Sequence, residues 1–317
     1  MTAKHLLLGL ALAIALTGCS TGENGTDVAD NICGQEPCYE GPFDPPWIAG
    51  HDYGLEFIDE RGISLTYDNR VLESVNALIF SDASEDWAKE DLAQMTENSL
   101  GEIKQVFHIG TSAELGIVDL YSKMRIYSKC DGMHDQCANP DGFIMYGLDN
   151  PLLEEWWPED EPGFLDQYRR VVKHELMHWV ALKLGGDYRL MDEWFTEGVA
   201  EIVSGGTYTP ISCWQEVEEW RQDPGHINPI SIRVDGDFPD TIQSIGEFYP
   251  LFGLAVRWLL DERGGNRSFL DLKALFADVG SNTGFARAFE DHMGLTLESY
   301  EARFWELMEA FLPPNCD

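Results

Sequence analysis

The chain has 317 residues, of which 44% are hydrophobic and 12% aromatic, and its formal net charge at pH 7 is −35. A chain of this length and composition can bury a sizeable core, which predicts one main folded domain with appendages and argues against extensive disorder. The negative charge argues against nucleic-acid binding, which needs clustered lysine and arginine. Because acidic residues are spread along the chain, we interpret them as a solvated surface rather than a patch that recruits a basic partner.

The first residues have the features of an export signal. Lys4 precedes an apolar run at 6–16, which is too short to span a bilayer comfortably as a helix. Residues 16–19, Leu-Thr-Gly-Cys, resemble the bacterial lipoprotein signal, in which cleavage precedes a cysteine that then carries fatty acyl chains such as palmitate. An ordinary signal peptide with an incidental cysteine is the alternative. The resemblance implies a signal peptide at 1–18 and a lipidated Cys19 that holds the protein to a membrane.

This resemblance also predicts the location. Ser20 follows Cys19, where an aspartate retains lipoproteins at the inner membrane of well-studied diderm bacteria. We therefore expect a lipid-anchored protein of the bacterial cell envelope, at the outer membrane and facing the periplasm or the surface. Residues 19–50 are rich in glycine, proline and small polar side chains, which predicts a flexible tether. The catalytic domain is then expected at 51–317.

Strands are expected in the first half of that domain. Residues 62–68 alternate in polarity and predict a strand. Residues 122–130 and 141–147 predict two further short strands, separated by a loop. Between these lies a helical pattern at 84–107, with apolar side chains at Trp87, Leu92, Met95, Leu100 and Ile103.

Helices are expected in the rest of the chain. A long helix is predicted at 166–184, with Gly185-Gly186 as its stop, and a second at 193–203, with Asp192 placed to cap it. From Phe248 onward the pattern is mostly helical, with breaks at Gly264-Gly265 and at Gly280. Strands followed by helices indicate an α+β fold, with a small N-terminal sheet, an active-site helix and a mostly helical C-terminal part.

The first of these helices carries a His-Glu-x-x-His motif. His174 and His178 are four residues apart, so both side chains project from one helix face and can reach one tetrahedral zinc ion. Glu175 lies around the helix from them, where it can take a proton from a water that the metal activates. An amphipathic helix with incidental polar residues is the alternative interpretation.

A third ligand follows on the next predicted helix. Glu197 follows His178 after eighteen intervening residues, beyond a glycine turn that can fold the second helix back on the first. This spacing, with Trp194, Glu197 and Gly198 in a Trp-x-x-Glu-Gly run, resembles the glutamate zincins of the aminopeptidase-N-like branch. The resemblance is close from His174 to Glu201 and loose from Ile63 to Met308. It implies a zincin-like metalloprotease fold and one Zn²⁺ per chain, held by His174, His178 and Glu197.

Two further residues have weaker support. Glu201 is one turn after Glu197 on the same face, so it could accept the outer N–H of a zinc-bound histidine; an exposed helix glutamate is equally compatible. Tyr249 precedes a helix, as the transition-state tyrosine does in the aminopeptidase-like family. The resemblance implies that its phenol donates to the oxyanion of the reaction; a core tyrosine is the alternative.

The sequence also departs from the aminopeptidases. It lacks the Gly-x-Met-Glu-Asn segment that binds a substrate's free N-terminus, and 141–147 stand in its place. The small stand-alone peptidase MA-like domains are therefore the better comparison. We expect a monomeric zinc metallopeptidase that hydrolyses peptides or proteins. A zincin scaffold kept as a surface binding lipoprotein, and a zinc amidase that acts on cell-wall peptides, are the alternatives.

The cysteines other than Cys19 are expected to form three disulfides. Their even number suits an exported chain, although six cysteines allow fifteen connectivities. Cys33 and Cys38 are five residues apart, and Cys130 and Cys137 are seven apart. These separations do not suit a zinc knuckle, which is the competing interpretation. Two short-range pairs leave one long-range pair by elimination, and the expected pairing is Cys33–Cys38, Cys130–Cys137 and Cys213–Cys316.

Overall fold

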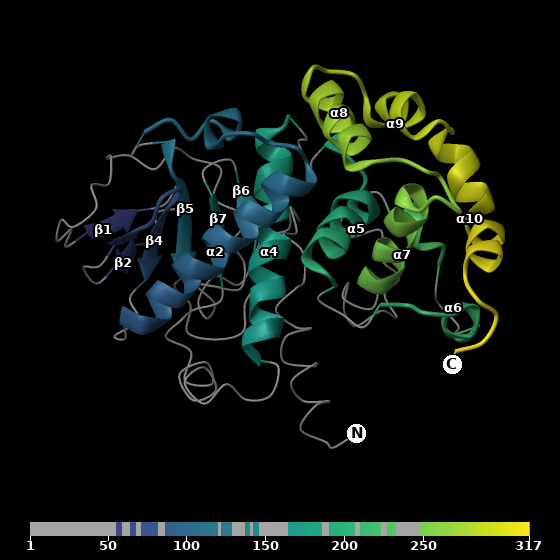
Figure 1. Cartoon of the computed structure of the whole chain (residues 1–317), viewed down its shortest axis with the longest axis horizontal. Helices are drawn as coiled ribbons and strands as arrows, with labels where there is room; N and C mark the ends of the chain where they lie inside the picture. The colour runs from purple at the N-terminus through teal and green to yellow at the C-terminus, as the bar shows by residue number, and fades with distance from the viewer. Residues whose placement is uncertain are drawn as a thin grey trace. The chain divides into compact units, whose positions relative to one another are not determined.

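The computed structural model describes much of the chain from Leu55 to Cys316, and its strands precede most of its helices (Figure 1). The α+β class is therefore confirmed. The expected signal peptide, Cys19, the tether, Cys33, Cys38 and Cys130 lie outside the described residues. The described ranges are 55–58, 64–67, 71–81, 86–119, 122–128, 137–139, 142–145, 164–185, 190–206, 210–222, 227–232 and 248–316.

The strands form two sheets. Strands β1 (Leu55–Ile58) and β2 (Ser64–Tyr67) pair antiparallel. The larger sheet has the order β3-β4-β5-β7-β6, with β4, β5 and β7 mutually parallel and an antiparallel strand at each edge. Its strands are β3 (Val71–Glu73), β4 (Ala77–Ser81), β5 (Met124–Ser128), β6 (Cys137–Asn139) and β7 (Gly142–Met145).

The register of the larger sheet aligns apolar residues across its strands. One row crosses all five strands through Leu72, Ile79, Ile126, Phe143 and Ala138, each aligned with the next. The expected strands at 62–68, 122–130 and 141–147 are confirmed as β2, β5 and β7. Strand β6 lies where a loop was predicted, because three residues give too short a pattern to recognise.

Two long helices follow strands of this sheet in the sequence. Helix α2 (Asp86–Val106) buries Leu92, Met95, Leu100 and Ile103, which confirms these four positions of the expected apolar stripe; the Trp87 side chain lies outside the described part. Its Glu97 accepts hydrogen bonds from the β3–β4 turn, through Asn76 N at 2.7 Å and Asn76 Nδ2 at 2.6 Å. Helix α4 (Phe164–Lys183) is joined to α2 by an ion pair of 2.6 Å between Lys173 and Glu102. A short 3₁₀ helix, η2 (Ser112–Leu115), follows α2.

The chain divides into two compact units, Met1–Gln105 with Ile109–Trp179, and Val106–His108 with Val180–Asp317. The second unit is helical. Its aromatic core includes Trp194, Phe195, Phe289 and Tyr300, whose ring centroids lie 5.4–6.1 Å apart in successive contacts. Its helices are α5 (Glu193–Ser204), α6 (Trp214–Arg221), η5 (Pro229–Ser231), α7 (Tyr249–Leu260), α8 (Phe269–Gly280), α9 (Phe285–Met293) and α10 (Leu297–Phe311).

The predicted helix boundaries agree with the structure. Helix α4 ends at Lys183, and Gly185 has the positive φ of 102° that glycine adopts most readily. Asp192 occupies the N-cap of α5, but its side chain makes no capping hydrogen bond; its carbonyl accepts from Phe195 N instead. The expected breaks at Gly264-Gly265 and Gly280 separate α7 from α8 and α8 from α9.

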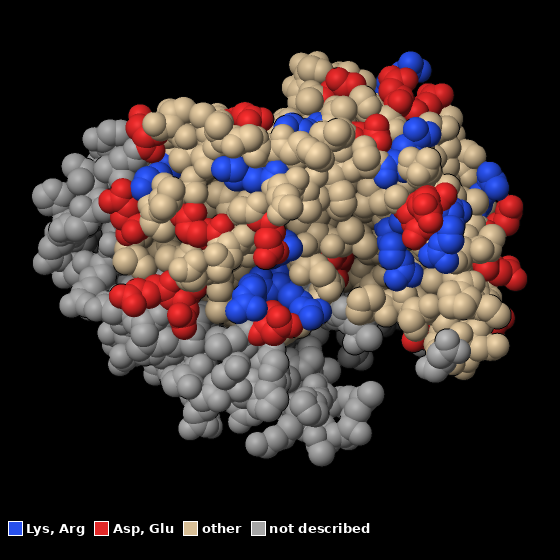
Figure 2. All heavy atoms as spheres, in the orientation of Figure 1, with Lys and Arg blue, Asp and Glu red and all other residues tan. Residues whose placement is uncertain are grey.

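A disulfide joins Cys213 to Cys316, with Cα atoms 5.2 Å apart, which matches the pairing expected for these two residues. The backbone supports it, because Trp214 N donates to Pro313 O at 2.8 Å. No helix within the described ranges is long and apolar enough to cross a bilayer. On the described face that Figure 2 shows, basic side chains lie among the acidic ones, which suits a solvated acidic surface.

Candidate metal centre

Helix α4 places two imidazoles together. His174 and His178 are one turn apart, and their Nε2 atoms lie 3.1 Å from each other. His174 is only 1% exposed and the neighbouring Glu175 only 3% exposed. An incidental polar face would be solvated, so burial argues against that interpretation of the motif.

Helix α5 provides the third side chain. His174, His178 and Glu197 each offer a ligand atom, and these atoms lie within 4.8 Å of one another. Glu197 is buried on its helix, as are Thr196 and Gly198 beside it. The structure thus brings together the three residues that the sequence predicts as ligands.

The donor set suits zinc. Two imidazoles and a carboxylate leave one position of a tetrahedral ion for water or substrate, the usual arrangement of catalytic zinc sites. At such an ion, with bonds of about 2.05 Å, two ligand nitrogens lie about 3.3 Å apart. The histidine nitrogens are within a few tenths of an ångström of that separation. The same distance also permits a direct hydrogen bond between the rings.

Close packing of α5 on α7 positions Glu197. A Cβ atom added at Gly198 would lie 2.7 Å from Val256 Cγ2 and 2.9 Å from the Phe252 carbonyl carbon. A Cβ added at Gly253 would meet Glu201 Cβ at 3.3 Å. Each helix therefore presents a glycine where the two cross. The glycine after Glu197 in the Trp-x-x-Glu-Gly run thus has a packing role, because a side chain there would push the helices apart.

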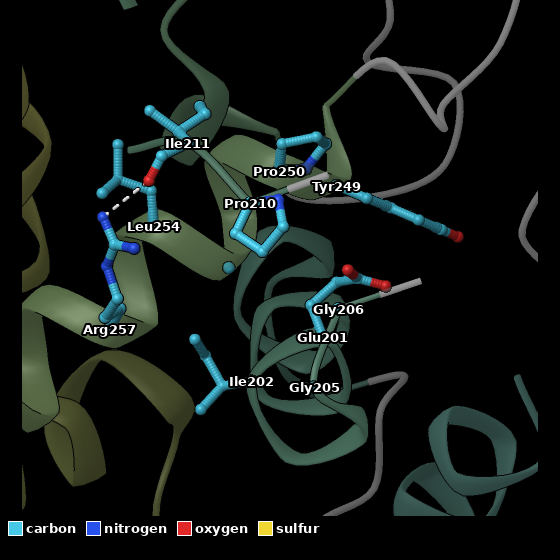
Figure 3. Close-up of a pocket in the computed structure, with 11 residues that line it drawn as sticks. Glu201, Ile202, Gly205, Gly206, Pro210, Ile211, Tyr249, Pro250, Leu254 and Arg257 are labelled. Carbon is cyan, nitrogen blue, oxygen red and sulfur yellow. Dashed lines mark hydrogen bonds between the residues drawn. The ribbon is translucent and has the colours of Figure 1, made fainter. Parts of the chain in front are cut away.

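Glu201 and Tyr249 are both buried, at 4% and 2% exposed, and both line a cavity between α5 and α7. Figure 3 shows the Glu201 carboxylate and the Tyr249 phenol extending toward the same side of these helices. The exposed-glutamate alternative for Glu201 is therefore wrong. Its bond to a zinc-bound histidine and the oxyanion contact of Tyr249 stay predictions.

One further group of potential ligands comprises Cys213, Glu216 and Cys316. Its two sulfurs are joined in the disulfide, so neither is the thiolate that a metal requires. We therefore assign no metal to this group.

Arg257 is a residue of interest that the sequence analysis did not single out. It is the one charged side chain of the apolar helix α7, and it lines the same cavity as Glu201. Burial lowers the pKa of its guanidinium, and the nearby Asp261 offsets only part of this effect. A lone charge in an otherwise apolar helix was the signal that would have identified it.

Comparisons with known proteins assign no family: no protein-family model matches this chain, and no curated protein matches it. The functional conclusion therefore depends on the residues themselves. Among the described residues, the group formed by His174, His178 and Glu197 is largely buried and could hold a metal ion.

Proposed function

We propose that this protein is a zinc-dependent metallopeptidase with a zincin-like fold. The observation that carries the proposal is the convergence of His174, His178 and Glu197, with ligand atoms within 4.8 Å of one another. This donor set is the one that the His-Glu-x-x-His motif and its distant glutamate predict for catalytic zinc.

The surrounding residues support hydrolysis in particular. A bound zinc ion would polarise the substrate carbonyl and make a water nucleophilic at neutral pH. Glu175 then accepts the proton of the attacking water at its carboxylate and delivers it to the leaving amine nitrogen. Tyr249, at the first turn of α7, donates its phenolic hydrogen to the oxygen on which negative charge develops. Glu201 orients a ligating histidine by accepting its outer N–H.

Metal analysis and one substitution test this proposal. The purified protein should contain about one zinc per chain, and Glu175→Gln should abolish hydrolysis while the zinc content is retained. Glu90→Gln is the matched control, because it makes the same change on the exposed face of α2. A protein with no zinc and no affinity for it would refute the proposal.

The choice of substrates separates the alternatives. Casein, short peptides and cell-wall fragments should be assayed with the parent and with Glu175→Gln. Cleavage of cell-wall fragments alone would identify an amidase. Zinc binding without any turnover that depends on Glu175 would identify a binding protein built on a zincin scaffold.

We also propose that the peptidase acts in the bacterial cell envelope, held to the outer membrane through lipids on Cys19. The proposal rests on the lipoprotein-like sequence at 16–19 and on Ser20. Cys19→Ala should move the protein from the membrane fraction to the soluble fraction. If the variant fractionates with membranes as firmly as the parent, lipid anchoring at Cys19 is wrong.

A further inference from the structure

The cavity that Glu201 and Tyr249 line extends beyond these two residues. It has a volume of about 230 Å³ and lies in the second compact unit. At roughly 30 Å³ per water molecule, this space suits a group about as large as one amino-acid residue, below the usual range for drug-sized ligands.

Among the described residues, the lining is apolar except at Arg257 and at the end where Glu201 and the Tyr249 phenol lie. Three glycines, Gly205, Gly206 and Gly253, leave the space open, and the other apolar lining residues are Ile202, Pro210, Ile211, Pro250 and Leu254. Figure 3 shows Glu201 and Arg257 on opposite sides of this lining. A ligand that fits both ends is therefore apolar in its middle and anionic at the Arg257 end.

The position of Arg257 is fixed by its contacts. Its Nη2 donates to the carbonyl of Ile211 at 2.9 Å, and its guanidinium lies 5.5 Å from the Phe311 ring centroid. It forms no ion pair with any residue in the described part of the chain. Asp261, which directly follows the last residue of its helix, instead pairs with Arg263 at 3.1 Å. A partly buried, held guanidinium with unused N–H donors is the group with which proteins bind carboxylates.

We propose that this cavity receives the C-terminal residue of a peptide substrate, with its apolar side chain among Ile202, Pro210 and Leu254 and its carboxylate on Arg257. This inference rests on the proposed peptidase function and specifies its substrate class. Glu201 follows the ligand Glu197 by one helical turn, about 6 Å, so the cavity begins close to a metal ligand. The protein would then remove short fragments from free, apolar C-termini.

Binding measurements on the Glu175→Gln protein, which should bind peptides without hydrolysing them, test this proposal. The probes are acetyl-Ala-Ala-Leu as the free acid and the same peptide as its C-terminal amide, titrated by calorimetry. The acid should bind about ten to a hundred times more tightly, the range for charge-assisted hydrogen bonds. Adding Arg257→Gln should remove this preference. Adding Arg263→Gln is the matched control and should preserve it, because Arg263 also lies over Phe311 but does not line the cavity.

Two results of these titrations would overturn the proposal. Equal affinity for acid and amide overturns the proposal, as does a preference for the acid that survives Arg257→Gln. If that variant does not fold, Ile202→Trp fills the cavity instead, and undiminished binding of the acid then overturns the proposal. Assaying the parent protein for hydrolysis separates the two claims: an Arg257-dependent preference for the acid, in a protein whose parent form hydrolyses none of the substrates, would retain this cavity and reject the peptidase.

Discussion

The crossing of α5 and α7 gives the sharpest test of how Glu197 is positioned. In Gly198→Ala the new methyl group would lie less than 3.0 Å from Val256 Cγ2 and from the backbone of Phe252, and backbone cannot rotate away. Overpacking of this kind costs about 1–3 kcal/mol, while alanine in a helix regains about 0.5–1 kcal/mol relative to glycine. We expect a net loss of about 1–2 kcal/mol in the free energy of unfolding.

Thermal unfolding followed by circular dichroism measures this loss. For a domain of this size the expected fall in Tm is about 2–8 °C. Gly101→Ala is the matched control, because Gly101 lies in helix α2 with nothing within 4 Å of an added Cβ. That variant should be more stable than the parent, by about 0.5–1 kcal/mol.

The same pair of variants should differ in zinc affinity. Separating α5 from α7 displaces Glu197, so Gly198→Ala should bind zinc about ten to a hundred times more weakly, whereas Gly101→Ala should bind it as the parent does. A Gly198→Ala protein with the Tm and zinc affinity of the parent would show that the helices do not cross at this glycine, and the placement of Glu197 would then be wrong.

Three other predictions follow from the contacts. Zinc at a hundred times its Kd should raise the free energy of unfolding by about 2.7 kcal/mol, and His178→Ala should abolish this rise in a calorimetric scan. Removing the disulfide by Cys213→Ala with Cys316→Ala should cost up to about 4–5 kcal/mol in urea unfolding, and peptide mapping without reduction should recover these cysteines linked. Burial raises the pKa of Asp271, but hydrogen bonds from Ser268 more than offset this, so the folded pKa is lowered. The stability that these hydrogen bonds contribute should be complete above the usual aspartate pKa and should disappear as the pH falls through the lowered pKa of the folded protein. The Asp271→Asn protein should lack this part of the dependence of stability on acid pH.

The sequence by itself determined the elements that local interactions specify. Helix α4, helix α5 and the helices from Tyr249 onward carry apolar stripes, and glycine lies at or just past the end of α4, α5, α8 and α9, so these signals are contained within a few residues. The spacing of His174 and His178 belongs to the same class, because one helical turn fixes it. The proposed third ligand, Glu197, was predicted because its spacing resembles that of the glutamate zincins.

Pairing and packing between distant segments were decided only by the tertiary structure. Strands β3, β4 and β6 are three to five residues long, and their neighbours in the sheet are chosen by side chains elsewhere in the chain. The contact of Gly198 with Phe252 joins residues from two helices that the sequence predicts separately. Arg257 likewise donates a hydrogen bond to the carbonyl of Ile211, which lies 46 residues earlier in the sequence. No local pattern records these contacts, because their energies arise only when the chain has folded and the partners are buried together.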